Sequence, residues 1–224
     1  MLLILLYNLF NKLISGDNMN YNDMFQYVYN VLNEANAIKS QKEESSFRNR
    51  YLHTKRVYSW CLRLLNDFDN VNEEILLTSA IFHDVGYSFG KENHAYNSSL
   101  IFEEYSRNNN FDSVFIERVS NNIKMHSDKS LIKDKSSNKE LILLLEADLL
   151  DEEGAMGISW DLMALGFNRP NDYTDVIEAI NKHSAHILNQ DYMITPLAKK
   201  YWEEKKKFVN EYIIEIKKDL FLEE

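Results

Sequence analysis

Residues 79–86 read SAIFHDVG, an apolar run that ends in an adjacent histidine and aspartate and is followed at once by a glycine. The asparagine and two glutamates at 72–74 are typical of a helix N-cap and an acidic first turn, so the sequence predicts a helix over 73–84. His83 and Asp84 then lie at the end of a buried helix, where an imidazole and a carboxylate are costly to remove from water unless something binds them. This pair favours a metal ion.

The composition favours helices throughout the chain. With 6 Gly and 2 Pro in 224 residues there are few turn-forming residues, and Leu, Ile, Glu, Lys and Asn are abundant. Apolar residues recur at helical spacing in further segments, which are 21–40, 49–66, 94–105, 111–126, 140–152, 174–188 and the region after 196. Residues 154–158 are interpreted as a close-packed segment and 166–171 as a loop. The sequence therefore predicts an all-α fold, and its length suits a single compact domain.

The charge of the chain excludes one class of partner. It carries 25 Lys and Arg against 35 Asp and Glu, a formal net charge of −10. A nucleic-acid duplex is bound by clustered basic side chains, so we expect no duplex partner. An acidic protein that handles a phosphorylated substrate needs a local positive centre, which a divalent cation can provide. The single cysteine, Cys61, is predicted to be a core residue of a cytoplasmic protein.

The N-terminal stretch MLLILLYNLFNKLIS is apolar but too short to span a bilayer, and it lacks the basic start and the cleavage site of a signal peptide. We therefore expect no membrane span, and we interpret residues 1–20 as an extension and 21–224 as the domain. One hypothesis is that translation begins at Met19, because residues 16–17 can be encoded by GGA-GAT, a purine-rich ribosome-binding sequence. The intact mass of natively expressed protein tests this hypothesis.

Five separated segments supply candidate metal ligands at helix ends or on apolar helix faces. The candidates are His53, His83, Asp84, His94, His126 and Asp148. Asp148 is the strongest anomaly, because its neighbours Ala147 and Leu149 are apolar and a buried carboxylate needs a cation or several donors. Imidazole nitrogen with carboxylate oxygen suits Mn, Fe, Co, Ni or Zn, and Mg if carboxylates and water dominate.

The candidates divide into a core set and two further histidines. His53, His83, Asp84 and Asp148 would fill part of an octahedral shell and leave positions for water and substrate. The remaining two histidines could hold a second ion with Asp84 as the bridge, so one or two ions per chain stay open. His94 and His126 have two alternative interpretations, as donors to a substrate phosphate or as ordinary histidines at the ends of helices.

Two further residues lie one helical turn beyond a candidate ligand. Arg56 follows His53 and is predicted to neutralise developing charge, and Asp151 follows Asp148 and is predicted to handle protons. His183 and His186 lie away from these segments, and we interpret both as surface or packing residues.

At these residues the sequence resembles the HD superfamily of metal-dependent phosphohydrolases, whose ordered pattern is H, HD, D, often with two histidines before the last aspartate. The matching segments are HTKRV at 53–57, AIFHDVG at 80–86, HA at 94–95, MH at 125–126 and EADLLD at 146–151. Residues 147–158, ADLLDEEGAMGI, resemble the fourth motif of small single-domain bacterial HD hydrolases that act on nucleotides. The resemblance extends over about 48–220.

The resemblance implies a helical HD-type domain and a divalent-metal-dependent phosphohydrolase. Such an enzyme cleaves a phosphoester or phosphoanhydride bond through metal-activated water, and the implied substrate is a small phosphorylated molecule, with a nucleotide as the first choice. Two other functions stay open, an HD-type diiron oxygenase and a sensor that binds a nucleotide without turnover. Iron content and oxygen consumption would distinguish the oxygenase from the phosphohydrolase. Retention of a nucleotide without turnover would identify the sensor. A homodimer is also left open.

Overall fold

The computed structural model describes residues 19–67, 69–170 and 172–222, and over these ranges it contains helices and no strand. One isolated antiparallel bridge joins Lys39 to Asn49 at the two ends of the loop before α3. The predicted all-α fold is therefore confirmed. The apolar stretch that begins the chain lies outside the described residues. Within the described ranges, no helix combines the length and the apolar character needed to cross a membrane.

The described helices follow one another along the chain with short connections. The α-helices are α2 (Tyr21–Glu34), α3 (Arg50–Leu64), α4 (Glu73–Phe82), α5 (His94–Asn108), α6 (Ser113–Met125), α7 (Lys139–Glu152), α8 (Ala155–Phe167), α9 (Thr174–Lys182) and α10 (Pro196–Asp219). The short 3₁₀ turns are η1 (Glu43–Ser45), η2 (Leu65–Asp67), η3 (Val85–Phe89), η4 (Lys129–Lys133) and η5 (Ser184–Asn189).

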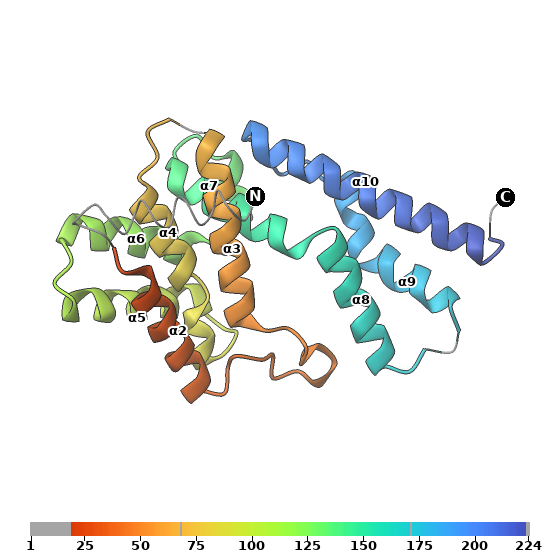
Figure 1. The fold of residues 1–224 in the computed structure, drawn as a ribbon, viewed down its shortest axis with the longest axis horizontal. Coiled ribbons are helices and arrows are strands. Elements are labelled where there is room, and N and C mark those ends of the chain that lie inside the picture. The colour runs from red at the N-terminus through yellow and green to blue at the C-terminus, as the bar shows by residue number, and fades with distance from the viewer. Residues whose placement is uncertain (1–18, 68, 171, 223–224) are drawn as a thin grey trace.

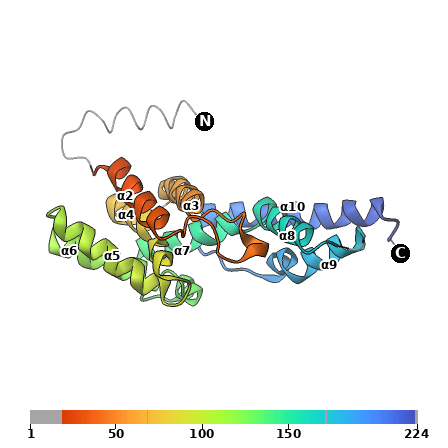
Figure 2. The same cartoon turned by 90° about the horizontal axis from the view of Figure 1, so that it is seen from below.

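The helices form two regions that share a core. Helices α2 to α7 lie on one side of Figure 1 and α8 and α9 on the other, while the long α10 begins beside α7 and runs along α8 and α9. Figure 2 shows that the described part of the chain is flat and elongated. One buried cluster contains Leu76 of α4, Leu144 of α7, Ile158 of α8 and Trp202 of α10, so the apolar core continues from one region into the other.

Helix α4 is buried on all sides, which explains why its end can carry polar groups into the interior. Every residue from Ile75 to Phe82 is buried, and the helix begins at Asn72, whose side chain accepts a hydrogen bond from the Ile75 backbone N–H at 3.0 Å. A helix that is apolar all round is stable only inside a protein. The two residues after it, His83 and Asp84, are therefore brought into the interior by their position in the chain.

Helix α7 is almost as buried and is tied to α10. The carboxylate of Glu146 is fully buried and accepts hydrogen bonds from the backbone N–H groups of Ile194 and Thr195, at 2.6 and 2.9 Å. It also accepts one from the Thr195 hydroxyl at 2.7 Å. These contacts fix the start of α10 relative to the helix that carries Asp148.

The observed boundaries differ from the predicted ones at three main places, the first being the helix predicted over 21–40, which ends at Glu34. Residues 154–158, interpreted as a close-packed segment, begin the helix α8, which the sequence pattern missed because its apolar residues form no single stripe. The helix predicted over 174–188 breaks at His183, where the backbone turns into η5. Close packing at Gly157 itself is present, since a Cβ there would lie 3.0 Å from the Ser184 hydroxyl.

We expect the substitution Leu144→Ala to destabilise the protein strongly. Leu144 is fully buried in the shared core, so the change leaves a cavity as well as removing apolar burial, at a cost of about 2–5 kcal/mol. Urea unfolding measures the change. The matched control is Leu100→Ala on α5, where 44% of the side chain is exposed, and we expect a change within about 0.5 kcal/mol. Equal losses in both variants would contradict the assignment of this core.

Candidate metal centre

The six predicted ligands come together in the structure, although they are spread over nearly half of the chain. His53 comes from α3, His83 and Asp84 follow α4, His94 begins α5, His126 follows α6 and Asp148 lies in α7. They form three overlapping groups in which the ligand atoms all lie within 4.8 Å of one another. The groups are His53, His83 and Asp84, then His83, His126 and Asp148, then Asp84, His94 and His126.

Asp84 lies between two pairs of histidines. Its Oδ2 atom is 3.6 Å from Nε2 of His53 and 3.8 Å from Nε2 of His83. Its Oδ1 atom is 3.6 Å from Nε2 of His94 and 3.4 Å from Nε2 of His126. One carboxylate thus presents one oxygen to each pair, which is the arrangement that a bridging ligand requires.

Gly86 allows the second pair to approach the first. A Cβ on this residue would lie 2.1 Å from the carbonyl oxygen of His94 and 2.4 Å from the backbone nitrogen of Ser98. Only glycine therefore lets η3 pack directly against the first turn of α5. The Gly86 N–H also donates to the Ser98 hydroxyl at 2.8 Å, which anchors this contact.

Each imidazole is held through Nδ1, so that Nε2 points toward the centre. The acceptors are the carbonyl oxygens of Ala80 for His83 at 2.8 Å, Ile123 for His126 at 2.7 Å and Lys91 for His94 at 3.1 Å, and Oδ2 of Asp151 for His53 at 2.7 Å. Carbonyl and carboxylate oxygens only accept, so the proton sits on Nδ1. Metal-ligating histidines almost always donate their other N–H in this way.

Two of these Nε2 atoms lie so close together that a positive charge between them is favoured. Nε2 of His53 lies 3.2 Å from Nε2 of His83, and both rings carry a proton on Nδ1. Two nitrogen lone pairs at this separation repel each other unless a proton or a metal ion lies between them. A divalent ion bound by nitrogen and carboxylate oxygen satisfies both rings, so the residues present fit such an ion.

Asp151 and Arg56 lie behind His53. Both carboxylate oxygens of Asp151 accept from the Arg56 guanidinium, at 2.7 and 2.9 Å, and one of them also accepts from His53. Only 1% of the Asp151 side chain is exposed. Asp151 thus holds both the His53 ring and the Arg56 guanidinium, while the proton-handling role of Asp151 and the charge-neutralising role of Arg56 stay predictions.

Sequence analysis missed two basic residues beside the ligands. Lys129 of η4 donates a hydrogen bond to Oδ2 of Asp148, and Nη1 of Arg50 lies 3.7 Å from Oδ2 of Asp84. The Arg50 guanidinium also lies over the ring of Tyr87, 3.1 Å from its centroid. Arg50 precedes His53 by three residues and shares its helix face, a signal that could have been used, whereas Lys129 lies between the predicted helices 111–126 and 140–152, where no pattern marks it.

Residues 50–153 match the family model of the HD domain. The match identifies an HD domain in this part of the chain. This match contains all six candidate ligands as well as Arg56 and Asp151, and HD domains bind divalent metals. The resemblance to the HD superfamily seen in the sequence is therefore confirmed. A comparison with curated proteins gives no match.

Solved structures share the fold of this HD protein. Bacillus subtilis YpgQ in complex with ADP is 19% identical, covers 88% of this chain and 93% of its own, and gives a TM-score of 0.63. An HD-superfamily hydrolase from Bacillus thuringiensis is 18% identical over 90% of this chain and 97% of its own, with a TM-score of 0.67. A predicted HD-superfamily hydrolase from an uncultured Thermotogales bacterium is 18% identical over 90% and 99%, with a TM-score of 0.60. At this identity the likeness shows the fold.

Burial and neighbouring charges set the protonation of the HD residues. Burial lowers the pKa of His83 to about 4, so its ring is neutral and its Nε2 lone pair can bind a metal. Burial raises the pKa of Asp84, but at low pH the protonated rings of His83 and its neighbours lower this pKa well below its usual range. Burial also lowers the pKa of His53, but hydrogen bonds with Asp148 and Asp151 raise it well above its usual range.

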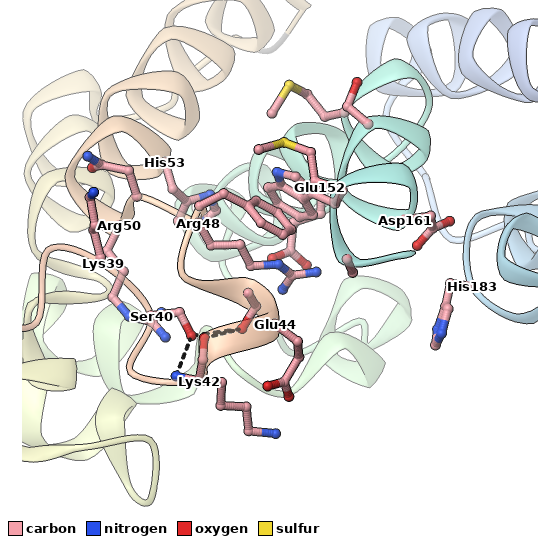
Figure 3. A pocket seen from close by; sticks show the side chains of 18 of the residues that line it. Lys39, Ser40, Lys42, Glu44, Arg48, Arg50, His53, Glu152, Asp161 and His183 are labelled. Atoms are coloured by element: carbon pink, nitrogen blue, oxygen red, sulfur yellow. Dashed lines mark hydrogen bonds between the residues drawn. The ribbon is translucent and has the colours of Figure 1, made fainter. Parts of the chain in front are cut away.

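The HD centre opens into a cavity of about 1090 Å³. The cavity extends from His53 and Arg50 on α3, along the loop before that helix, to Asp161 on α8 and His183 at the end of α9 (Figure 3). His183 is exposed, as expected of a surface residue. The sequence did not indicate that it also lines the cavity. His186 pairs with Glu153, with 3.1 Å between Nε2 and Oε1.

We expect metal binding to release protons from the metal-free protein. The pKa of His53 lies above the ordinary histidine value of about 6.5, so near neutral pH this ring carries a proton that a metal must displace. Affinity for Mn²⁺ should therefore fall as the pH falls toward 6. Calorimetric titration with Mn²⁺ at pH 7.5 in two buffers of different ionisation enthalpy measures the release. His53→Gln should abolish it, and an equal heat in both buffers for the unaltered protein would contradict this protonation.

We expect Asp151→Asn to weaken metal binding about 10- to 100-fold, because an amide cannot hold both the His53 ring and the Arg56 guanidinium in their present orientation. Mn²⁺ titration of the metal-free variant measures this loss. The control is Asp134→Asn, which changes an exposed carboxylate in the loop before α7. If the variant binds metal as tightly as the unaltered protein but shows an altered pH dependence of activity, Asp151 handles protons and is not needed to orient His53.

Proposed function

We propose that this protein is a divalent-metal-dependent phosphohydrolase that cleaves a phosphoester or phosphoanhydride bond of a small phosphorylated molecule, with a nucleotide as the preferred class. The observation that carries the proposal is the convergence of four imidazole Nε2 atoms and two buried carboxylates beside an open cavity. A divalent ion in such a site lowers the pKa of a coordinated water and polarises a phosphoryl oxygen, which is the chemistry that hydrolysis of these bonds requires.

The residues of the chain divide the work as follows. His53, His83, Asp84 and Asp148 would hold the catalytic ion, and Asp84 with the two remaining histidines would hold a second ion where one is bound. Asp151 keeps the His53 ring in the tautomer that frees its Nε2 atom. We propose that the native ion is one of the divalent metals that suit these ligands, which are Mn, Fe, Co, Ni, Zn and Mg.

The lining of the cavity supports an anionic substrate. Its basic residues outnumber its acidic ones, eight to seven, although the whole chain has 25 basic and 35 acidic residues. The basic residues are Lys39, Lys42, Arg48, Arg50, Arg56, Lys91, Lys129 and Lys182. A cavity of about 1090 Å³ is ample for a nucleotide, since ligand pockets are typically about 300–1,000 Å³.

Two observations favour a nucleotide within this class. Trp160 of α8 lines the cavity, and the guanidinium of Arg48 lies 4.1 Å from its ring centroid, so an aromatic ring and a cation are adjacent there. Bases stack on such surfaces. The solved complex of Bacillus subtilis YpgQ with ADP supports the same class by its shared fold.

A second candidate is an HD-type diiron oxygenase, favoured by the way Asp84 presents one oxygen to each histidine pair. A bridging carboxylate suits two irons as well as it suits two ions of a hydrolase. Iron content and oxygen consumption separate the two functions. A nucleotide sensor without turnover is the third.

Three wider expectations stay proposals. We propose that residues 21–224 act as one domain, because the apolar core is continuous from α4 and α7 into α8 and α10. We also propose a cytoplasmic location, in keeping with the buried free thiol of Cys61. A homodimer is the assembly that we keep as an alternative to the monomer.

We expect purified, metal-loaded protein to release phosphate or pyrophosphate from at least one member of a broad panel of nucleotides and phosphoesters. Asp84→Ala should reduce this activity by at least about 100-fold, since the variant loses the carboxylate shared by both histidine pairs. Metal analysis accompanies the screen: one ion per chain supports the four-ligand site, and two bring in His94 and His126. Asp134→Asn is again the control.

Three results would contradict the hydrolase. No release from any substrate by metal-loaded protein argues against turnover at phosphorus. Bound iron with oxygen consumption favours the oxygenase, and tight nucleotide retention without turnover favours the sensor.

A further inference from the structure

We propose that Lys129 is an anion-binding residue of the metal centre: its ammonium group, held against Asp148, binds the phosphoryl oxygens of the substrate and in return weakens metal binding. This inference rests on the proposed function and names a residue for the substrate side of that site. It assigns chemistry to a position that the sequence motifs do not contain, because Lys129 lies in the segment between His126 and α7.

The first argument is the position of the ammonium group. Lys129 begins η4, and its Nζ donates hydrogen bonds to Oδ2 of Asp148 and to the carbonyl oxygen of His126, the latter at 3.1 Å. Both contacts are with residues of the candidate ligand set. The side chain is 28% exposed and lines the cavity, so the ammonium group lies between the metal ligands and the space that a substrate would enter.

The second argument is the division of Asp148 between two cations. While Oδ2 of Asp148 accepts from Lys129, Oδ1 lies 3.1 Å from Nε2 of His53 and 3.9 Å from Nε2 of His83. The Oδ1 side therefore faces the nitrogen atoms that would bind an ion. A single carboxylate thus joins the ammonium group to the metal position, and the two positive charges must lie close together.

The third argument is the balance of charge at the centre. Asp84 and Asp148 together carry two negative charges, which cancel one divalent ion, while Asp151 is already paired with Arg56. Two further cations lie beside these carboxylates, Arg50 at 3.7 Å from Oδ2 of Asp84 and Lys129 on Asp148. Without them the loaded centre would be neutral and would offer a phosphate little electrostatic attraction. Lys129 adds positive charge on the Asp148 side of the centre, and a positive centre attracts a phosphate dianion.

The fourth argument is the hydrogen-bonding capacity of the group. An ammonium has three N–H donors and no acceptor. Two of the Lys129 donors have partners among the described residues, Asp148 and His126. The third remains for a ligand in the cavity, and a phosphoryl oxygen is an acceptor that forms short, strong bonds to charged donors.

These arguments lead to opposite expected effects on the two ligands. The ammonium group repels a divalent ion bound to the same carboxylate, so its removal should tighten metal binding. It attracts phosphoryl oxygens, so its removal should weaken anion binding. A lysine that merely held η4 or Asp148 in place would weaken metal binding when removed, and one that only filled the site in the metal-free protein would leave anion binding unchanged.

The experiment uses the full chain and two probes that need no turnover, Mn²⁺ and inorganic phosphate. Metal-free protein is titrated with Mn²⁺, and Mn²⁺-loaded protein is then titrated with phosphate, for the unaltered chain and for Lys129→Met. We expect the variant to bind Mn²⁺ several-fold tighter and phosphate about tenfold weaker, because a charge-assisted hydrogen bond is lost. Lys129→Arg keeps the charge and should retain most of the phosphate affinity.

The control is Lys133→Met, which removes an exposed lysine from the other end of η4 and should change neither affinity. Unchanged phosphate binding in Lys129→Met, or weaker Mn²⁺ binding, would overturn the inference. Because neither titration measures hydrolysis, a protein without phosphohydrolase activity would refute the proposed function while leaving the role of Lys129 to be decided by these affinities.

Discussion

The buried pair of imidazole nitrogen atoms on His53 and His83 is the constraint on which the rest of the site depends. Their Nε2 atoms lie 3.2 Å apart, and hydrogen bonds at Nδ1 keep both lone pairs aimed at the same point. Such an arrangement is unfavourable in the absence of a positive charge, and so are the two buried carboxylates beside it. One bound cation would compensate the burial of both imidazole rings and both carboxylates at once. No single contact between two of these residues does so.

Hydrogen bonds from the histidine Nδ1 atoms keep this centre in place. Three of the four histidines donate to the carbonyl oxygen three residues earlier in the chain, so the same local turn orients His83, His94 and His126. The fourth, His53, lies in the first turn of α3, where the preceding backbone carbonyls accept helical hydrogen bonds, and its Nδ1 donates to Asp151 instead. The centre is therefore oriented before any ligand arrives, which lowers the cost of binding.

The second region of the molecule forms part of the cavity beside the centre. Helices α8 and α9 lie beyond the residues that match the HD model, yet they form the wall of the cavity opposite α3 (Figure 3). Figure 1 shows α10 beginning beside α7 and running along α8 and α9, and Glu146 secures the start of that helix to α7. The candidate metal ligands therefore come from the α3–α7 part of the fold, while Trp160 and other cavity residues come from α8 and α9.

The sequence by itself determined the helical class and the identity of the six candidate ligands, because an apolar helix with His83-Asp84 at its end and Asp148 between apolar neighbours has few explanations other than a bound cation. Local pattern also placed most helices, but it missed α8, whose apolar residues follow no single face. Only the tertiary structure decided that Asp84 faces two histidine pairs, that Asp151 supports His53, and that Lys129 contacts Asp148. The physical reason is that these relations depend on contacts between residues up to 98 positions apart, and the direction of a side chain across such a distance follows from packing.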